Sequence, residues 1–472
     1  MKRSGVPVTG VPKKGAILNF PWRFKPTMAE APLIREARGI GPEAFEAFME
    51  TREEPEWLRQ ARREAWQILR ETPKPGPDDE AWRRTDIRAL SIEDLATVIA
   101  GDGATPPEGM RQILEQRDDL AGGLLLFDGQ PVLHWVDKRL ERRGLIFTDL
   151  ITAVREHPDH VVPYLYQVVR PGDGFFAAIN AAFWRNGIFL YVPRDLELTL
   201  PLRAVIGLQG APTDFSRILI VVEPGAQVTF IDERLADDAV GAAFHNGTVE
   251  IHLKENARLT YIALQNWGRY MWNFTHERAF VDRDSTLDWV VVGMGGGVTK
   301  TFLEVSLIGR GATAYMSGVF FFDGQQHADY DTEQDHIAPY TKSDLLYKVA
   351  LKDRARSVWQ GMIRAHPGAQ KTDAYQANRN LILSPHARAD SIPGLEIMAN
   401  DLRCTHGATV GQINEEELFY LMSRGLSRAV ATRLIVEGFF APVLDRIPVP
   451  DIQRQADALI HRKLGVPPEE EF

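Results

Sequence analysis

The segment Gly225-Ala226-Gln227-Val228 decides the fold, because the same pattern recurs five more times along the chain. Each copy has a turn residue, a small residue and a polar residue before a strand-like run, and the small residues are Ala226, Ala257, Ser285, Ala312, Ala355 and Ala387. The small residue advances by 31, 28, 27, 43 and 32 positions, and we attribute the long step to an insertion around 329–341. A period of about 30 residues made of short strands favours a stacked β-solenoid over a β-sandwich, which has no fixed corner pattern.

Strand-like runs fill the spaces between these corners. The clearest lie at 188–192, 217–222, 228–231, 259–262 and 287–291. Alternate residues of each run would face the core, and each coil would pair in parallel with the coils above and below it. We therefore predict a mainly β protein with a parallel β-helix core at residues 121–410, interrupted by one helical insert near 173–185.

Helical patterns precede this core, within residues 1–120. The first 29 residues contain no Asp or Glu but six Lys and Arg, which indicates a basic arm and leaves an organelle transit peptide open. A helix is expected to open at 54–58 and to run through Leu69, because its apolar residues keep to one face. Ser91 is the expected N-cap of a further short helix, with Asp94 in the capping-box position.

Residues 411–472 should form a C-terminal helical domain of three amphipathic helices. Asn414 and Ser427 are the expected N-caps of the first two helices, Gly425 ends the first, and the third begins after Pro450. An open solenoid end would expose unpaired backbone groups. We therefore expect these helices to cap the core as well as to dock a partner.

The composition excludes several classes of protein. The chain has 472 residues, a net charge of −10 and no basic face of the kind that nucleic-acid binding needs, so no nucleic-acid partner is expected. The apolar runs, such as 124–127 and 290–292, are too short to span a bilayer, so no membrane partner is expected either. The single cysteine, Cys404, rules out an internal disulfide and a CxxC zinc site, and a reducing cytoplasm is the expected location.

The sharpest chemical feature is the pair Cys404 and His406. Two residues apart, a thiol and an imidazole share one face of a strand, and both are ligands suited to iron. A buried free cysteine beside a hydrogen-bonded histidine is one alternative, and Cys–His nucleophilic catalysis is another. One such pair cannot supply the four ligands of a cluster, so cluster binding would require a partner chain or a second copy.

Two further stretches carry weaker signals. Gly293 to Thr301 resembles a phosphate loop but fails the pattern, because Lys300 follows Thr299 rather than Gly, so we interpret the stretch as a glycine turn of the solenoid and expect ATP chemistry in another subunit. The acidic and imidazole run His327 to His336 indicates the solvent face of an edge strand or loop, with metal or partner contact as the alternative. Its carboxylates at 329–335 also leave open a β-helix enzyme acting on polysaccharide.

Several blocks of the chain resemble the SufB/SufD family, and its SufD branch most. They are NLILSPHA at 380–387, PGLEI at 393–397, CTHGATVG at 404–411 and LFYLMSRG at 418–425, with NAAFW at 180–184, EPEWL at 54–58 and EAWRRTD at 80–86 upstream. Members of the SufB branch carry a cysteine in the region that corresponds to 380–390. This chain has none there, which is why the resemblance is closer to SufD.

The resemblance implies a right-handed parallel β-helix between helical regions, and a non-catalytic scaffold subunit that supports cluster assembly and iron acquisition at a SufB–SufD interface. It places Cys404 and His406 at that interface, where an iron–sulfur cluster would be bound transiently and not by the isolated chain. It also implies that SufC, the ATPase partner, docks on the C-terminal helices through Leu418, Phe419, Tyr420, Arg424 and Gly425. SufB or a second copy would be the other direct partner, and a cysteine desulfurase and a sulfur carrier would be indirect ones. A secreted-type polysaccharide enzyme and a purely structural binding module are the rival functions.

Overall fold

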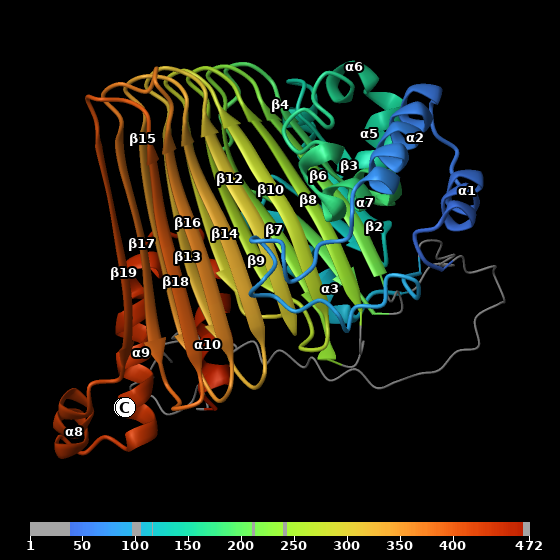
Figure 1. The fold of residues 1–472 in the computed structure, drawn as a ribbon. Helices are drawn as coiled ribbons and strands as arrows, with labels where there is room; N and C mark the ends of the chain where they lie inside the picture. The colour runs from blue at the N-terminus through green and yellow to red at the C-terminus, as the bar shows by residue number, and fades with distance from the viewer. Residues whose placement is uncertain (1–37, 97–104, 116, 210–212, 239–242, 466–472) are drawn as a thin grey trace, which may run out of the picture.

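The computed structural model describes residues 38–96, 105–115, 117–209, 213–238 and 243–465. The basic arm predicted for the first 29 residues lies outside these ranges. The described chain forms a parallel β-solenoid that is preceded and followed along the chain by helices, which confirms the predicted fold class (Figure 1).

Two sheets face each other across the core of the solenoid, and each long coil contributes one strand to each sheet. The ten-stranded sheet contains β2 (Gln130–Val136), β1 (Gly122–Phe127), β5 (Leu202–Leu208), β7 (Gln227–Ala236), β9 (Arg258–Asn266), β11 (Thr286–Gly293), β13 (Thr313–Phe322), β15 (Lys342–Leu351), β17 (Asp373–Ile382) and β19 (Arg403–Gln412). The nine-stranded sheet contains β3 (Ile146–Asp149), β4 (Asn186–Val192), β6 (Thr213–Val222), β8 (Phe244–Leu253), β10 (Trp272–Val281), β12 (Val298–Leu307), β14 (His327–His336), β16 (Arg356–Ala365) and β18 (Arg388–Ile397). All neighbours within the described sheets are parallel except β1–β2 and β3–β4.

The repeated segment forms one corner of each coil. Its turn residue has a left-handed backbone in the first four copies, with φ of 73° at Gly225, 54° at Asn256, 55° at Asp284 and 76° at Gly311. Gly, Asn and Asp tolerate that conformation best. The small residue that follows is buried, and its N–H donates to the carbonyl three residues earlier, as from Ala226 to Glu223 at 3.1 Å.

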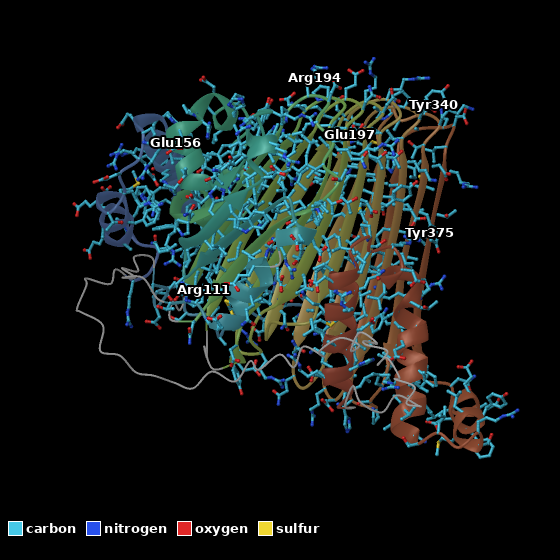
Figure 2. The ribbon with its side chains drawn as sticks, turned by 180° about the vertical axis from the view of Figure 1, so that it is seen from behind. Arg111, Glu156, Arg194, Glu197, Tyr340 and Tyr375 are labelled. Atoms are coloured by element: carbon cyan, nitrogen blue, oxygen red, sulfur yellow. The ribbon has the colours of Figure 1, made fainter. Side chains whose placement is uncertain are left out.

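The long step of 43 residues has a different cause from the predicted insertion. Residues 329–341 belong largely to β14, which is a regular strand. Ala355 and Ala387 precede β16 and β18 in the other sheet, so these copies mark the opposite corner, about one and a half coils beyond Ala312. At the original corner threonine replaces the small residue, in Tyr340-Thr341 and Lys371-Thr372, and Figure 2 labels Tyr340 at this rim.

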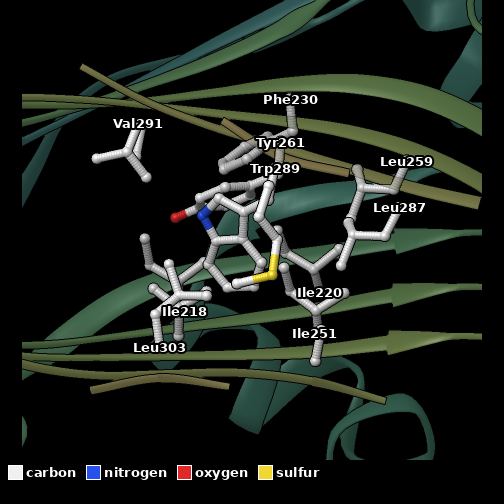
Figure 3. Close-up of a cluster of buried hydrophobic side chains, with 14 of the residues drawn as sticks. Ile218, Ile220, Phe230, Ile251, Leu259, Tyr261, Leu287, Trp289, Val291 and Leu303 are labelled. Carbon is white, nitrogen blue, oxygen red and sulfur yellow. The ribbon is translucent and has the colours of Figure 1, made fainter. Parts of the chain in front are cut away.

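The core fills the space between the two sheets. Ile218, Ile220 and Ile251 come from the nine-stranded sheet and meet Tyr261 and Trp289 from the ten-stranded sheet (Figure 3). These positions alternate along their strands, as expected where one face of each strand is turned inward. All five predicted strand runs lie within strands of the structure.

Helices cover part of the outer surface. The structure contains α1 (Pro42–Glu50), α2 (Glu56–Glu71), α3 (Glu108–Glu115), η1 (Arg117–Asp119), α4 (Lys138–Glu141), α5 (Leu150–Glu156), α6 (Pro158–Val161), η2 (Pro171–Asp173) and α7 (Phe175–Phe183) before the long coils. The helix predicted to run through Leu69 is α2, and the predicted insert is α7. Among the described helices, none combines the length and the apolar character that a bilayer-spanning segment needs.

Residues 78–96 cross the outer face of the nine-stranded sheet, and we call them the N-terminal strap. Trp82 packs against Phe274 of β10, with ring centroids 5.2 Å apart, and the Arg84 guanidinium donates to Gln360 of β16 at 2.8 Å. The helix predicted to start at Ser91 does not form. Within the described residues 91–96, Ile92 and Leu95 are buried against the sheet, and the Leu95 N–H donates to the Ile92 carbonyl at 3.3 Å in a tight turn instead of a helix.

Three helices follow the solenoid: α8 (Glu415–Ser423), α9 (Arg428–Leu444) and α10 (Pro450–Leu464). Asn414 and Ser427 cap α8 and α9 as predicted, and Gly425, with φ of 96°, ends α8. The predicted capping of the solenoid end is wrong, because α9 and α10 pack beside the ten-stranded sheet (Figure 1). The outer face of that sheet carries apolar residues such as Val319 and Phe321, whose burial against α9 is favourable.

Candidate functional site

The last coil leaves an open end on the solenoid. Within the described chain β19 pairs only with β17, and β18 pairs only with β16, so each is an edge strand. The side chains of Leu395, Ile397 and Val410 on these two strands are exposed, Val410 by 53%. A long edge with unpaired backbone groups and apolar side chains is a template for association with another chain.

Cys404 and His406 both lie on β19 at this open end. The register places them opposite Ala374 and Gln376 of β17, which are buried and face the inside of the solenoid. Strand alternation therefore directs both side chains to the inner side of the last coil, at its mouth. His406 is exposed and Cys404 is half-buried, so the alternative of a buried pair does not hold.

The thiol of Cys404 is protonated at neutral pH in the isolated chain. Burial, followed by the negative charge of Asp373, raises its pKa to about 11. A nucleophilic cysteine would need the opposite shift. In the part of the chain that the structure describes, no group of three or more His, Cys, Asp and Glu side chains could hold a metal ion, so these residues supply no further ligand to Cys404 and His406.

A polar floor lies beneath this pair, which the sequence reasoning missed. Gln376, Asn378 and Asn380 occupy three successive inward positions of β17 and are buried. The Asn380 amide donates to the Thr409 carbonyl at 3.2 Å and to the Ser391 hydroxyl at 3.1 Å, which ties the last coils together. The signal was available, since amides at alternate positions of a strand indicate a polar face where a core face was expected.

The predicted docking residues of α8 divide into two groups. Phe419 and Tyr420 are exposed by 72% and 56%, and the Arg424 guanidinium lies over the Tyr420 ring, 5.2 Å from its centroid. Leu418 is only 1% exposed, so it holds the helix in place and cannot contact a partner. Gly425 is exposed and acts through its backbone in ending the helix.

The glycine stretch after β11 is a corner of the solenoid, as predicted. Gly296 has φ of 85°, and a Cβ on Gly295 would lie 2.2 Å from the backbone of Trp267. Lys300 comes next on β12 and is fully buried, with its ammonium 3.0 Å from Asp329 and 2.9 Å from Asp331. The lysine therefore serves an ion network of the sheet rather than a phosphate.

The run from His327 to His336 is β14, an internal strand between β12 and β16, so the edge-strand interpretation is wrong. The strap covers part of it: the Thr85 hydroxyl donates to the buried Asp329 at 2.6 Å. Burial raises the pKa of Asp331 to about 6. Asp329 and Asp331 are both paired to Lys300, Glu333 is paired to Arg364, and Asp335 lies 2.9 Å from His366. The run therefore gives no support to the alternative of a polysaccharide enzyme.

Comparison with known proteins places the chain in a family. The family model described as "SUF system FeS cluster assembly, SufBD core domain" matches residues 206–439, and the one described as "SufBD protein N-terminal region" matches residues 132–204. Curated relatives from Staphylococcus haemolyticus, Staphylococcus epidermidis and Staphylococcus aureus carry the name iron–sulfur cluster assembly SufBD family protein. Each is 28% identical over 431 residues, which cover 88% of this chain and 91% of the relative. These names do not separate the SufB branch from the SufD branch.

Proposed function

The chain belongs to the SufBD family of iron–sulfur cluster assembly proteins, and we propose that it is a non-catalytic scaffold subunit of the SufD type. In this proposal the nascent cluster is cargo, held transiently between this chain and a SufB-type partner or a second copy. A SufC-type ATPase supplies the energy, and a cysteine desulfurase and a sulfur carrier act upstream in the cytoplasm.

One observation carries the proposal: Cys404 and His406 lie two residues apart on β19, an edge strand that pairs only with β17 within the described chain, at the mouth of the solenoid. A second chain that extends the sheets past β18 and β19 would bring its own ligands to this mouth. The exposed imidazole is available to iron, while the half-buried thiol stays protonated until a cation approaches. That arrangement supports iron acquisition at the seam between two chains as part of the proposal.

The absence of further cysteines supports the SufD type over the SufB type. Cys404 is the single cysteine of the chain, and the stretch 380–390 contains none. A subunit with one thiol cannot hold a cluster alone, because clusters take four ligands. Sulfur chemistry is therefore proposed to belong to the partner, and this chain contributes structure and an iron ligand.

The C-terminal helices support docking of an ATPase on α8. Only Ile413 and Asn414 separate the end of β19 from the start of α8, so a displacement of α8 acts directly on the strand that carries Cys404. Phe419 and Tyr420 present an exposed aromatic surface on this helix. Aromatic residues are typical anchors of protein interfaces.

Replacement of His406 by Ala tests the proposal in the complex reconstituted with SufB-type and SufC-type partners. We expect the subunits to assemble normally and the cluster absorbance formed under anaerobic conditions to be lost. His386→Ala is the matched control, because His386 is also exposed but lies at a corner, away from β19. Full cluster formation by the His406 variant would refute the role of His406 and favour a purely structural module.

A further inference from the structure

A cavity of about 660 Å³ opens on the outer face of the nine-stranded sheet and extends as far as β18 at the open end. Its base is made of two adjacent rows of side chains that run across the strands from β10 to β18. One row is His276, Phe302, Asp331, Gln360 and Ile392, and the other is Arg278, Glu304, Glu333, Met362 and Gly394. We call this cavity the sheet groove.

The sheet groove has an apolar base with an acidic border. Phe302, Met362 and Ile392 supply apolar surface, and each is only partly covered by the rest of the chain. The acidic border carries Asp79 and Glu80 of the strap together with Asp173, Glu304, Asp331 and Glu333. Such a surface fits a ligand with apolar and cationic groups side by side.

The border keeps an excess of negative charge after its internal ion pairs are counted. Arg278 is shared by Asp173 and Glu304, Lys300 by Asp329 and Asp331, and Arg364 by Glu333 and Glu396, so each of these cations serves two carboxylates. Glu304 and Glu333 are direct cross-strand neighbours. Burial and the charge of Glu304 raise the pKa of Glu333, which reports a site that lacks positive charge.

His276 also lines the sheet groove and is buried. Burial lowers the pKa of His276 to about 4, so the imidazole is neutral at physiological pH. The residue therefore adds no positive charge to offset the carboxylates of the border.

The first residues of the chain carry the complementary pattern. Residues 1–29 contain no Asp or Glu, and within them Phe20, Trp22 and Phe24 alternate with Pro21, Arg23 and Lys25. In an extended conformation the three aromatic rings would share one face and the two cations the other. We propose that the sheet groove binds residues 20–25 of this same chain, with the aromatic face on the apolar base and Arg23 and Lys25 at the carboxylates of the border.

The lengths agree with this assignment. Six extended residues span about 20 Å, and the four strand steps from β10 to β18 span about 19 Å. The described chain begins at Arg38, which bridges to Ala96, and the Thr213 hydroxyl at the start of β6 bonds to Ala96. The thirteen residues from Lys25 to Arg38 can reach about 40 Å, whereas β18 is about 29 Å from β6 at six strand steps. Tethering also raises the effective concentration of the segment at the groove.

Photo-crosslinking of the full chain tests the proposal. With p-benzoylphenylalanine in place of Trp22, we expect cross-links to Met362 and Ile392 within the same chain, identified by mass spectrometry of a mixture of labelled and unlabelled protein. The same probe at Val8 should give no cross-links to these residues. Cross-links to other surfaces, or only between chains, would overturn the proposal.

Charge reversal provides the matched comparison. Glu304→Lys with Glu333→Lys should reduce the cross-link yield about tenfold, whereas Glu64→Lys with Glu71→Lys on the exposed side of α2 should leave it unchanged. Arg23→Glu with Lys25→Glu should reproduce the loss without touching the solenoid, which covers the case in which the groove variant fails to fold. A yield that none of these reversals lowers would show that the segment does not bind by charge. The experiment needs neither cluster nor ATPase, so its outcome is independent of the proposed scaffold function.

Discussion

Replacing Lys300 with Met should destabilise the solenoid by about 3–5 kcal/mol, the usual cost of removing one partner from a buried ion pair. Lys300 and Asp329 are both 0% exposed, and the ammonium lies between Asp329 at 3.0 Å and Asp331 at 2.9 Å. Without the lysine, a buried carboxylate loses its counter-ion and keeps only the hydrogen bond from Thr85. Because Thr85 belongs to the strap, the loss should be felt in the attachment of the strap as well.

The effect should depend on pH in a definite direction. Burial holds the pKa of Asp331 at about 6, above its ordinary value of about 4, so the folded state favours the protonated carboxyl. The stability that comes from this raised pKa is fully present below about pH 4 and is lost as the pH rises through about 6. Removal of Lys300 raises this pKa further, and the penalty of the substitution should therefore shrink on acidification from pH 8 to pH 5.

Urea unfolding followed by circular dichroism and by tryptophan fluorescence measures both effects, since Trp82 of the strap lies 5.9 Å from the Lys300 ammonium. Lys342→Met is the control, because Lys342 is an exposed lysine on a neighbouring coil and should change stability by less than about 0.5 kcal/mol. Adding Asp329→Asn to Lys300→Met should recover part of the loss, since the unpaired charge is then removed. A Lys300 variant within about 1 kcal/mol of the wild type at pH 8 would refute the reasoning.

Further predictions concern the corners, the thiol and the docking helix. Gly295→Ala should lower the thermal midpoint of unfolding strongly, because the added Cβ would clash with the Trp267 backbone. Gly438→Ala inside α9 meets open space and should stabilise the protein by about 0.5–1 kcal/mol. An equal effect of both substitutions would contradict the packing argument. Iodoacetamide should alkylate Cys404 at pH 7.5 more slowly than a free cysteine, and the rate should rise as the pH approaches about 11. A rate equal to that of free cysteine would contradict the raised pKa of this half-buried thiol. Phe419→Asp should weaken ATPase binding about tenfold or more without changing the unfolding midpoint, whereas Leu418→Ala should cost about 2–4 kcal/mol in stability; calorimetric binding and thermal unfolding separate the two, and unchanged binding by the Phe419 variant would remove α8 from the interface.

Most of the fold could be predicted from local residue preferences for turns, helix caps and strands. The left-handed corner residues, such as Gly225 and Asn256, can be recognised because few residue types accept a positive φ. The caps Asn414 and Ser427 can be recognised because a short polar side chain satisfies the first free N–H groups of a helix. The two-residue spacing of Cys404 and His406 could be converted into a shared strand face for the same reason, since alternation is a property of any strand.

Contacts between neighbouring coils could not be predicted from these local patterns. The 43-residue step was misassigned because both corners of a coil use the same turn chemistry. Only the sheet order shows that Ala355 lies at the other corner, about one and a half coils beyond Ala312. β14 was taken for an exposed edge because its alternation of acidic residues looks solvated. The pairing of Asp329 with Lys300 and its cover by Thr85, 244 positions away, cannot be seen in the local pattern.

The sequence by itself determined the β-solenoid, the turn residues of its first four corners, the caps of α8 and α9, and the presence of a thiol and an imidazole on one strand, because each depends on backbone conformation within a few residues. The tertiary structure alone decided that α9 and α10 lie along the flank, that Leu418 is buried, and that β19 is left open with Cys404 at its mouth. Those outcomes depend on which apolar faces meet, and that choice is made by surfaces from distant parts of the chain. Because α9 and α10 pack on the flank of the ten-stranded sheet, they do not cover β18 and β19, and the end of the solenoid that carries Cys404 and His406 stays open.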